Sequence, residues 1–414
     1  MKRIISYLLL VAAASCIDPY IPNLKNYKSL LVVEGLITNE NSSYKIKLDR
    51  TTSSEDSTPE KVTDANVYIT DGDGIRTALQ NCGDGYYITD SISFRGSIGQ
   101  KYSLQIITGD EKEYRSEECT MLPVAAIETL YYEKGEEIIG NLGESITGLK
   151  IFLNSTDFSG MNQYFRWTFE EVWKFIIPYP QEYTYTFIND TTINFESVPA
   201  IQNVCWKKNQ SGEIMTNSIL SGGANNINKQ LIQFIAPAKS DRVTQEYSIL
   251  VKQYSVSKKE YEFWNNLKKA GEAGGDIFAS QPYSVISNIH NVNSQDEMVL
   301  GYFEVSAVSQ KRIFITAHEL EQLSLPHYRT ECVQIEKSPE DWHSAKHPTW
   351  DEIYHMYVDS HNFAFVGPIV TPGTILPGHV FTRSLQKLVF SANVCGLCEF
   401  SGFSAKPDFW IDLE

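Results

Sequence analysis

Short strands separated by turns of glycine and aspartate are the feature that most restricts the fold of this chain. At 44–49, apolar and polar residues alternate at every position, as in a strand with one buried and one solvated face. The segments 71–74 and 83–85 contain only Asp and Gly, which accept the positive φ angles of tight turns. We expect strands at 30–37, 44–51, 65–70, 75–80, 85–89, 101–108 and 113–122. Such a series within residues 29–122 predicts a β-sandwich of immunoglobulin or transthyretin-like type.

The remainder of the chain, residues 123–414, predicts a larger domain that is also mainly β. The longer strands are expected at 149–154, 164–177, 245–254, 299–308 and 311–316. One helix is predicted near 257–271, because Ser257 and Glu260 form a capping box and Gly271 lies where the apolar stripe ends. A chain of this length exceeds what a single core usually serves. The predicted fold class is therefore all-β, with one or two helices and two domains.

The N-terminus has the three parts of a secretion signal. A charged start, Met1-Lys2-Arg3, is followed by an apolar run at 4–14 that is too short to span a bilayer. Ala13-Ala14-Ser15-Cys16 resembles a lipobox, so we expect residues 1–15 to be removed and Cys16 to carry lipid. Residues 16–28 then form a lipidated, proline-bearing tether. The alternative is an ordinary signal peptide, cut after Ala14.

The cysteine count fits this interpretation. Seven cysteines leave an odd thiol in an oxidising compartment, whereas six remain once Cys16 is set aside. Cys82 and Cys119 both lie within the predicted sandwich, and we expect them to form a bridge. The remaining four allow three pairings, and two structural disulfides are favoured over a redox pair or a zinc site; they are Cys205, Cys332, Cys395 and Cys398.

Charge and motif content exclude several classes of function. A formal net charge of -16 argues against nucleic acid as a partner, because phosphate binding needs clustered Lys and Arg. It also argues against adhesion to an anionic membrane surface. The chain contains no G-x-S-x-G nucleophile elbow, no phosphate-binding loop and no dinucleotide fingerprint. We therefore predict no catalytic residue and no cofactor, and hence a protein that is not an enzyme.

Histidines and acidic turns offer weak candidates for a metal site. His343 and His347 have a spacing that could place both rings on one helical face, but Ser344 stands where a zinc hydrolase has its glutamate. Pro348 also ends any helix at that point. The acidic turn at 71–74 lacks the glutamate of a calcium loop, because the twelfth position is Cys82. No metal ligand is predicted, and an envelope metal-dependent hydrolase is the least favoured alternative.

Large aromatic side chains are concentrated at 164–173. Exposed aromatic rings can stack on sugars or anchor a protein interface, although such rings are more often part of a core. We favour the core interpretation. Trp167 and Trp173 are kept as candidate interface or ligand-binding residues.

Several stretches together resemble a family of Bacteroidetes outer-membrane lipoproteins catalogued as a domain of unknown function (number 4249). The resemblance extends in order along nearly the whole chain, from Cys16 and the segments 31–35, 65–69 and 85–87, through 164–167, 205–206, 253–257, 288–289 and 301–303, to 395–398 and 406–410. It implies an outer-membrane lipoprotein with an immunoglobulin-like N-terminal domain. It also implies a setting in which such proteins accompany TonB-dependent transporter barrels. It supplies no catalytic residues.

From the residues and the resemblance together we expect a non-catalytic cell-envelope lipoprotein, lipid-anchored to the cell outer membrane. Its expected role is that of an accessory or interaction subunit of an outer-membrane complex, with a TonB-dependent barrel as the partner. The alternative is a lipoprotein that binds a glycan or peptide for nutrient uptake through Trp167 or Trp173. That alternative requires at least one of these two rings to line an open groove.

Overall fold

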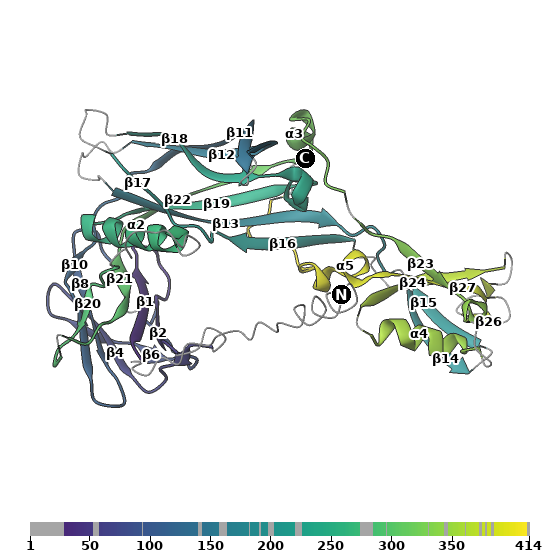
Figure 1. The fold of residues 1–414 in the computed structure, drawn as a ribbon, viewed down its shortest axis with the longest axis horizontal. Coiled ribbons are helices and arrows are strands. Elements are labelled where there is room, and N and C mark those ends of the chain that lie inside the picture. The colour runs from purple at the N-terminus through teal and green to yellow at the C-terminus, as the bar shows by residue number, and fades with distance from the viewer. Residues whose placement is uncertain are drawn as a thin grey trace, which may run out of the picture.

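The computed structural model confirms an all-β protein built from several mainly antiparallel sheets. Figure 1 shows three parts in a row: the N-terminal sandwich, a central pair of sheets and a smaller C-terminal lobe. The structure describes residues 29–52, 58–92, 94–139, 143–156, 164–181, 183–189, 192–197, 203–219, 226–273, 285–294, 296–329, 331–342, 347–360, 362–371, 375–376, 379–381 and 385–411. The predicted signal peptide, Cys16 with its predicted lipid and the predicted tether to residue 28 lie outside these residues. Within them, no helix combines the length and the apolar character needed to cross a membrane.

The N-terminal sandwich consists of two sheets, here called sheet A and sheet B. Sheet A contains, in spatial order, β21 (Leu300–Val305), β1 (Leu31–Ile37), β2 (Lys45–Arg50), β7 (Tyr86–Ile88) and β6 (Gln80–Asn81), with β3 (Glu60–Lys61) beside β2. Sheet B contains β20 (Ile289–Asn291), β9 (Glu113–Ser116), β8 (Lys101–Ile107), β4 (Asn66–Asp71) and β5 (Arg76–Ala78), with β10 (Cys119–Thr120) beside β8. The alternation predicted from sequence appears in β8, where Tyr102, Leu104 and Ile106 are buried and the residues between them are not. These side chains belong to the core between the two sheets.

The sandwich is not confined to the predicted range 29–122. Strands β20 and β21 come from the second half of the chain and occupy one edge of each sheet. Strand β21 pairs in parallel with β1, from Val32 opposite Leu300 to Ile37 opposite Val305. The predicted boundary is therefore incomplete: the strand expected at 299–308 is present, but the sheet that it joins depends on distant contacts that the local sequence does not show.

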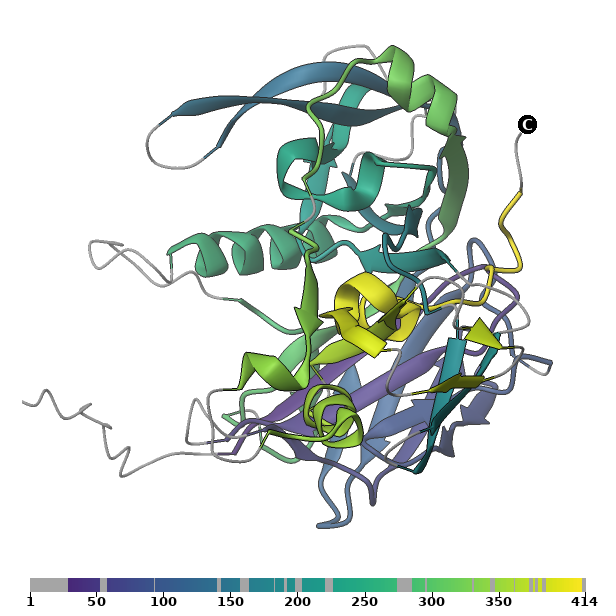
Figure 2. The ribbon, with the colours of Figure 1, turned by 90° about the vertical axis from the view of Figure 1, so that its right-hand side faces the viewer.

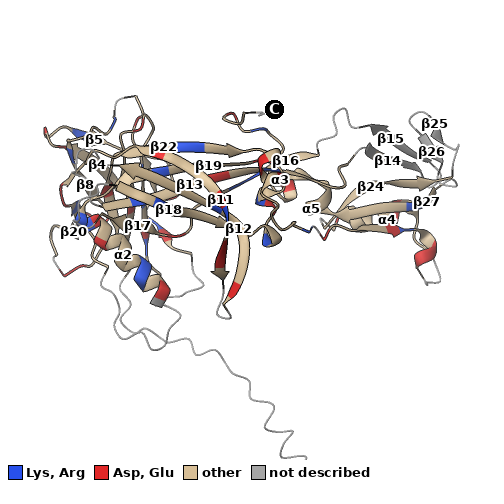
Figure 3. Cartoon of the chain, turned by 90° about the horizontal axis from the view of Figure 1, so that it is seen from above, with Lys and Arg blue, Asp and Glu red and all other residues tan. Residues whose placement is uncertain are grey.

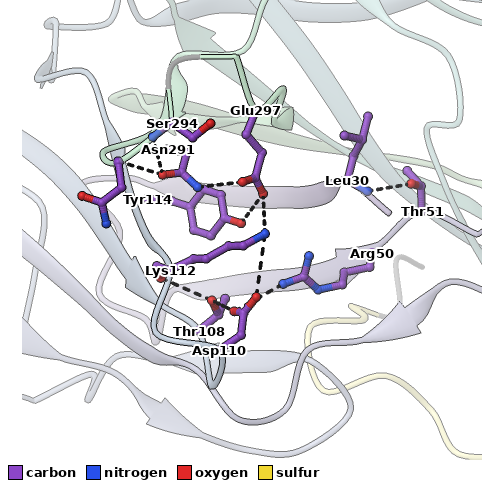
Figure 4. Close-up of polar contacts among 11 residues, drawn as sticks. Leu30, Arg50, Thr51, Thr108, Asp110, Lys112, Tyr114, Asn291, Ser294 and Glu297 are labelled. Carbon is purple, nitrogen blue, oxygen red and sulfur yellow. Dashed lines mark hydrogen bonds and ion pairs between the residues drawn. The ribbon is translucent and has the colours of Figure 1, made fainter. Parts of the chain in front are cut away.

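A polar network fixes this returning segment to the first half of the sandwich (Figure 4). Glu297 accepts hydrogen bonds from the Tyr114 hydroxyl at 2.7 Å and the Asn291 amide at 2.9 Å, and it forms an ion pair with Lys112 at 3.2 Å. Burial opposes the ionisation of Glu297, but the bonds from Tyr114 and Lys112 outweigh it and lower the pKa of the carboxyl. Lys112 also lies 3.8 Å from Asp110, which faces Arg50 of β2.

The central part contains two sheets packed around a second core. The three-stranded sheet has the order β11 (Ile127–Ile139), β12 (Glu144–Thr156) and β18 (Asn226–Ile235). The five-stranded sheet has the order β16 (Val204–Gln210), β13 (Tyr164–Ile176), β19 (Tyr247–Ser255) and β22 (Val308–Ile315), with β17 (Met215–Ser218) beside β13. Short turns η1 (Pro237–Lys239) and η2 (Asp241–Val243) connect the sheets, and α3 (Ala317–Gln322) follows β22. Aliphatic and aromatic side chains of both sheets form one cluster.

The predicted helix is present as α2 (Lys258–Ala273). The Ser257 hydroxyl accepts a hydrogen bond from the Glu260 amide at 3.2 Å, which confirms the serine half of the predicted capping box. The Glu260 carboxylate is directed into the protein instead, where it accepts a bond from the Ser306 hydroxyl at 3.2 Å. Figure 1 shows α2 between the sandwich and the central sheets.

The C-terminal lobe is a separate small β unit with its own aromatic core. One sheet contains β14 (Tyr183–Asn189), β15 (Thr192–Ser197), β26 (His379–Phe381) and β25 (Ile375–Leu376), and the other contains β23 (Gln334–Lys337), β27 (Leu385–Ala392) and β24 (Phe363–Val370). The turn η3 (Pro339–Asp341) and the helix α4 (Trp350–Val358) precede β24, and α5 (Asn393–Gly396) and η5 (Cys398–Phe400) follow β27.

Two disulfides decide between the pairings that the sequence left open. Cys205 pairs with Cys398, and Cys332 pairs with Cys395. The first bond ties η5 to β16 of the central sheet, so the C-terminal segment is covalently held to the middle of the molecule. The prediction of two structural disulfides among these four cysteines is confirmed.

The expected bridge between Cys82 and Cys119 is wrong, because both are free thiols. Cys82 follows β6 at one edge of sheet A, whereas the Cys119 thiol lies 3.7 Å from the Phe303 carbonyl of β21, at the opposite edge. Strands spaced about 4.8 Å apart put these edges roughly 15–20 Å from each other, beyond the reach of a disulfide. Burial raises the pKa of the Cys119 thiol to about 12.

Candidate functional site

The two tryptophans proposed as ligand-binding residues are part of the central core. Trp167 is 1% exposed, and its indole nitrogen donates to Gln253 at 2.9 Å. Trp173 is 6% exposed and donates to Asp241 at 3.0 Å. The favoured core interpretation is therefore correct, and the alternative of an open aromatic platform at these positions is wrong.

Three histidines in the described part of the chain have separate local partners. His318 contacts Gln322 at 2.8 Å, His347 contacts the Pro339 carbonyl at 2.9 Å, and His355 lies 3.0 Å from Asp359. His343 and His361 lie outside the described residues. Across the described ranges, no three His, Cys, Asp or Glu side chains are grouped so that they could hold a metal ion.

The acidic segment at 71–74 is the turn between β4 and β5. The Asp71 carboxylate accepts hydrogen bonds from the backbone amides of Asp73 at 3.1 Å and Ile75 at 2.9 Å. Gly74 has a φ of 80°, in the left-handed region that glycine adopts without strain. The interpretation of this motif as a hairpin turn is confirmed.

A buried charged cluster lies where the sandwich, α2 and the central sheet meet. Arg166 of β13 and Glu304 of β21 form an ion pair at 2.7 Å, and both residues are 8% exposed. The Arg166 guanidinium also lies over the rings of Tyr254 and Trp264, at 4.7 and 4.8 Å from their centroids. Breaking such a pair leaves an uncompensated buried charge, so it constrains the three elements to one arrangement.

Glu260 adds a second carboxyl to this cluster. It is 3% exposed and contacts Glu304 as well as the Ser306 hydroxyl. Burial, together with the charge of Glu304 and a hydrogen bond to it, raises the pKa of Glu260 well above its usual value. The two carboxyls therefore face a single arginine, and the raised pKa favours the protonated form of Glu260, which leaves one negative charge to be compensated.

A groove of 880 Å³ lies beside this cluster, on the outer face of sheet A. Along β1 the inward side chains Leu31 and Val33 are fully buried, whereas Val32, Glu34 and Leu36 point outward. Helix α2 covers part of that outer face, where the Phe263 ring is tilted against the Tyr302 ring with 4.7 Å between their centroids. The remaining wall is formed by apolar side chains of sheet A and α2, with Val285 from the segment before β20; those of the sheet and the helix include Val32, Tyr86, Leu267 and Leu300.

Charged residues stand at one side of this groove, on β1 and β2. Lys47 forms ion pairs with Asp49 at 3.0 Å and with Glu34 at 3.7 Å. Lys45 also lines the groove, is exposed, and makes no ion pair with any described residue. The groove thus combines an apolar wall with one uncompensated cation.

A second exposed feature is the end of the β11–β12 hairpin, here called the arm and defined as residues 135–139 and 144–148. Strand β18 pairs with β12 only as far as Leu149, so the arm extends beyond the third strand. Figures 2 and 3 show the hairpin projecting away from the body of the molecule. Among described residues, neither strand of the arm pairs with a further strand. Ile138 is 72% exposed, and Glu136, Glu137 and Glu144 make the arm acidic.

The sequence predicted neither the groove nor the arm. The arginine at position 166 within an aromatic run was a signal for the charged cluster beside the groove, because a charged residue among core rings needs a buried partner. Its partner Glu304 and the groove depend on contacts between distant segments. The arm lies in a region where the sequence predicted a strand only from residue 149 onward.

Comparisons with known proteins identify one family. The family model described as "Domain of unknown function (DUF4249)" matches residues 17–312, which include the sandwich, α2 and the central sheets except for the end of β22. No curated protein matches the chain.

Proposed function

The chain belongs to the DUF4249 family, and from this premise we propose that it is a non-catalytic cell-envelope lipoprotein that acts as an interaction subunit of an outer-membrane complex. In this proposal Cys16 carries the lipid anchor and the folded part lies outside the cytoplasm. The partner is a β-barrel of the outer membrane, of the TonB-dependent transporter type.

The arm is the observation that carries the proposal. A strand with an unpaired edge presents a row of backbone donors and acceptors that can pair with a strand of another protein. A two-stranded ribbon is at best marginally stable in water. Docking on a partner would supply the third strand that β18 supplies at the base of the hairpin. The exposed Ile138 adds an apolar contact at the same place.

Two further observations support a place outside the cytoplasm. The N-terminal residues have the pattern of a lipoprotein signal. Two disulfides join segments far apart in sequence, and such bonds persist in oxidising compartments.

The test is a pull-down of the tagged protein from its native outer membranes in mild detergent, followed by mass spectrometry. We expect one β-barrel protein to be recovered in stoichiometric amount. In a shortened variant, an Asn-Gly turn replaces residues 136–147 and joins the paired Gly135 and Gly148 directly. This variant is expected to fold but to lose the barrel.

A matched pair of point variants controls for general surface effects. Ile138→Asp changes the arm, whereas Ile75→Asp changes a side chain that is 64% exposed in the β4–β5 turn. Only Ile138→Asp should reduce recovery of the barrel. The expected reduction is about ten-fold, which corresponds to a loss of about 1.4 kcal/mol of binding free energy. If the wild-type protein is recovered without a barrel, the proposal is refuted. If the shortened variant recovers as much barrel as wild type does, the arm is not the contact site.

A further inference from the structure

The groove beside α2 has the properties of a ligand site rather than of ordinary protein surface. Its volume of 880 Å³ lies within the range of small-molecule pockets. Solvated faces of antiparallel sheets are usually polar. Here the outward side chains Val32, Leu300 and Tyr302 are apolar, and Leu267 of α2 remains 37% exposed at the border.

One polar group that lines the groove, the Glu304 carboxylate, already has its hydrogen-bond partners within the protein. The Glu304 carboxylate accepts hydrogen bonds from the Arg166 guanidinium at 2.7 Å and from the Trp264 indole at 3.2 Å. A sugar or a peptide backbone needs several hydrogen-bonding partners when it leaves water. The apolar wall supplies few, whereas a hydrocarbon chain requires none and gains about 0.8 kcal/mol for each methylene that it buries.

The charges at the border of the groove indicate which head group such a hydrocarbon chain would carry. Lys47 is held between Asp49 and Glu34, so its charge is compensated within the protein. Lys45 has no ion-pair partner among the described residues. An anionic group placed at Lys45 would therefore meet a cation that is not shared with the protein.

We propose that this groove binds one long acyl chain with an anionic head group, the chain lying between α2 and sheet A and the anion lying at Lys45. A free fatty acid and an anionic lysophospholipid share this chemistry. Neither the lipid anchor nor the arm is needed for binding.

The experiment uses the full-length chain carrying Cys16→Ser, purified without detergent. A fluorescent polyunsaturated fatty acid, cis-parinaric acid, is bound and then displaced by palmitate or by lysophosphatidylglycerol. Displacement by either ligand supports the site, and the tighter of the two identifies the source of the acyl chain. The absence of saturable cis-parinaric acid binding would overturn the proposal.

Matched variants locate the ligand. Leu267→Glu places a charge in the groove wall and should weaken palmitate binding at least ten-fold, about 1.4 kcal/mol, whereas Ile75→Glu in the sandwich turn should leave it unchanged. Lys45→Glu should weaken binding of palmitate but not of hexadecanol, which has the same chain and no charge. Circular dichroism checks that each variant is folded. Equal affinity of folded Leu267→Glu and wild type would place the ligand elsewhere and refute the assignment.

Discussion

Glu260 is the residue whose environment differs most from what its local sequence suggests. The capping box predicts that the Glu260 side chain reaches back to the Ser257 amide, but the side chain is 3% exposed and contacts Glu304 and Ser306. Two carboxyls and one arginine share this site. The position thus serves both the helix start and the junction of α2 with β13 and β21.

The raised pKa of Glu260 predicts a stability that depends on pH. The contribution of the protonated Glu260 side chain to the free energy of unfolding is fully present below the unfolded-state pKa. It is lost as pH rises through the higher folded-state pKa. The free energy of unfolding should therefore fall with a slope of up to about 1.4 kcal/mol per pH unit. Glu260→Gln keeps a neutral hydrogen-bonding group and should remove this slope, as measured by denaturation at a series of pH values.

Glu297 provides a control, because its contribution to stability should change with pH in the opposite direction. Its pKa is lowered, so its contribution is present above the unfolded-state pKa and is lost as pH falls through the folded-state pKa. Glu297→Gln should therefore differ from wild type at neutral pH and converge with it in acid. An unchanged pH profile for Glu260→Gln would mean that Glu260 is ionised in the folded protein.

Among the described elements, β21 has a strict backbone requirement. Gly301 has a φ of 86°, and a Cβ atom added there would lie 2.0 Å from the Val33 carbonyl oxygen of β1. Only glycine satisfies both the backbone conformation and the close parallel pairing. The position therefore controls whether β21 can join sheet A.

We expect Gly301→Ala to destabilise the protein by at least about 3 kcal/mol, because strain and a backbone clash combine. Gly74→Ala is the matched control, since its φ is 80° but the added Cβ meets no atom within 4 Å. That variant should lose only about 1 kcal/mol from strain. Chemical denaturation of both variants measures the difference, and equal losses would show that the contact with Val33 is relieved without cost.

For the whole molecule, the sandwich depends on residues that follow the central sheets. Phe303 and Val305 of β21 and Ile289 of β20 belong to the same buried cluster as Leu31 and Val33. Removing the two late strands would expose this core and leave β1 with an open edge. The family match to residues 17–312 includes this returning segment and ends within β22.

A fragment of residues 29–122 should therefore fail to fold alone. We expect no cooperative unfolding transition by circular dichroism, and partial recovery of the transition when a peptide of residues 285–308 is added. The same peptide with Gly301→Ala is the control and should not restore folding. A cooperative transition of the fragment alone would show that β20 and β21 are accessory to the sandwich.

Local patterns in the sequence were sufficient for the all-β class, for most strands of the sandwich and for α2. Alternation, turn residues and a capping serine act over a few neighbouring positions, so they can be read without knowledge of the rest of the chain. The tertiary structure alone decided the place of β20 and β21 in the sandwich, the cysteine pairing, the buried position of Glu260 and the groove. Each depends on segments far apart in sequence, and the free energy of such contacts comes from burial and pairing that no local pattern encodes.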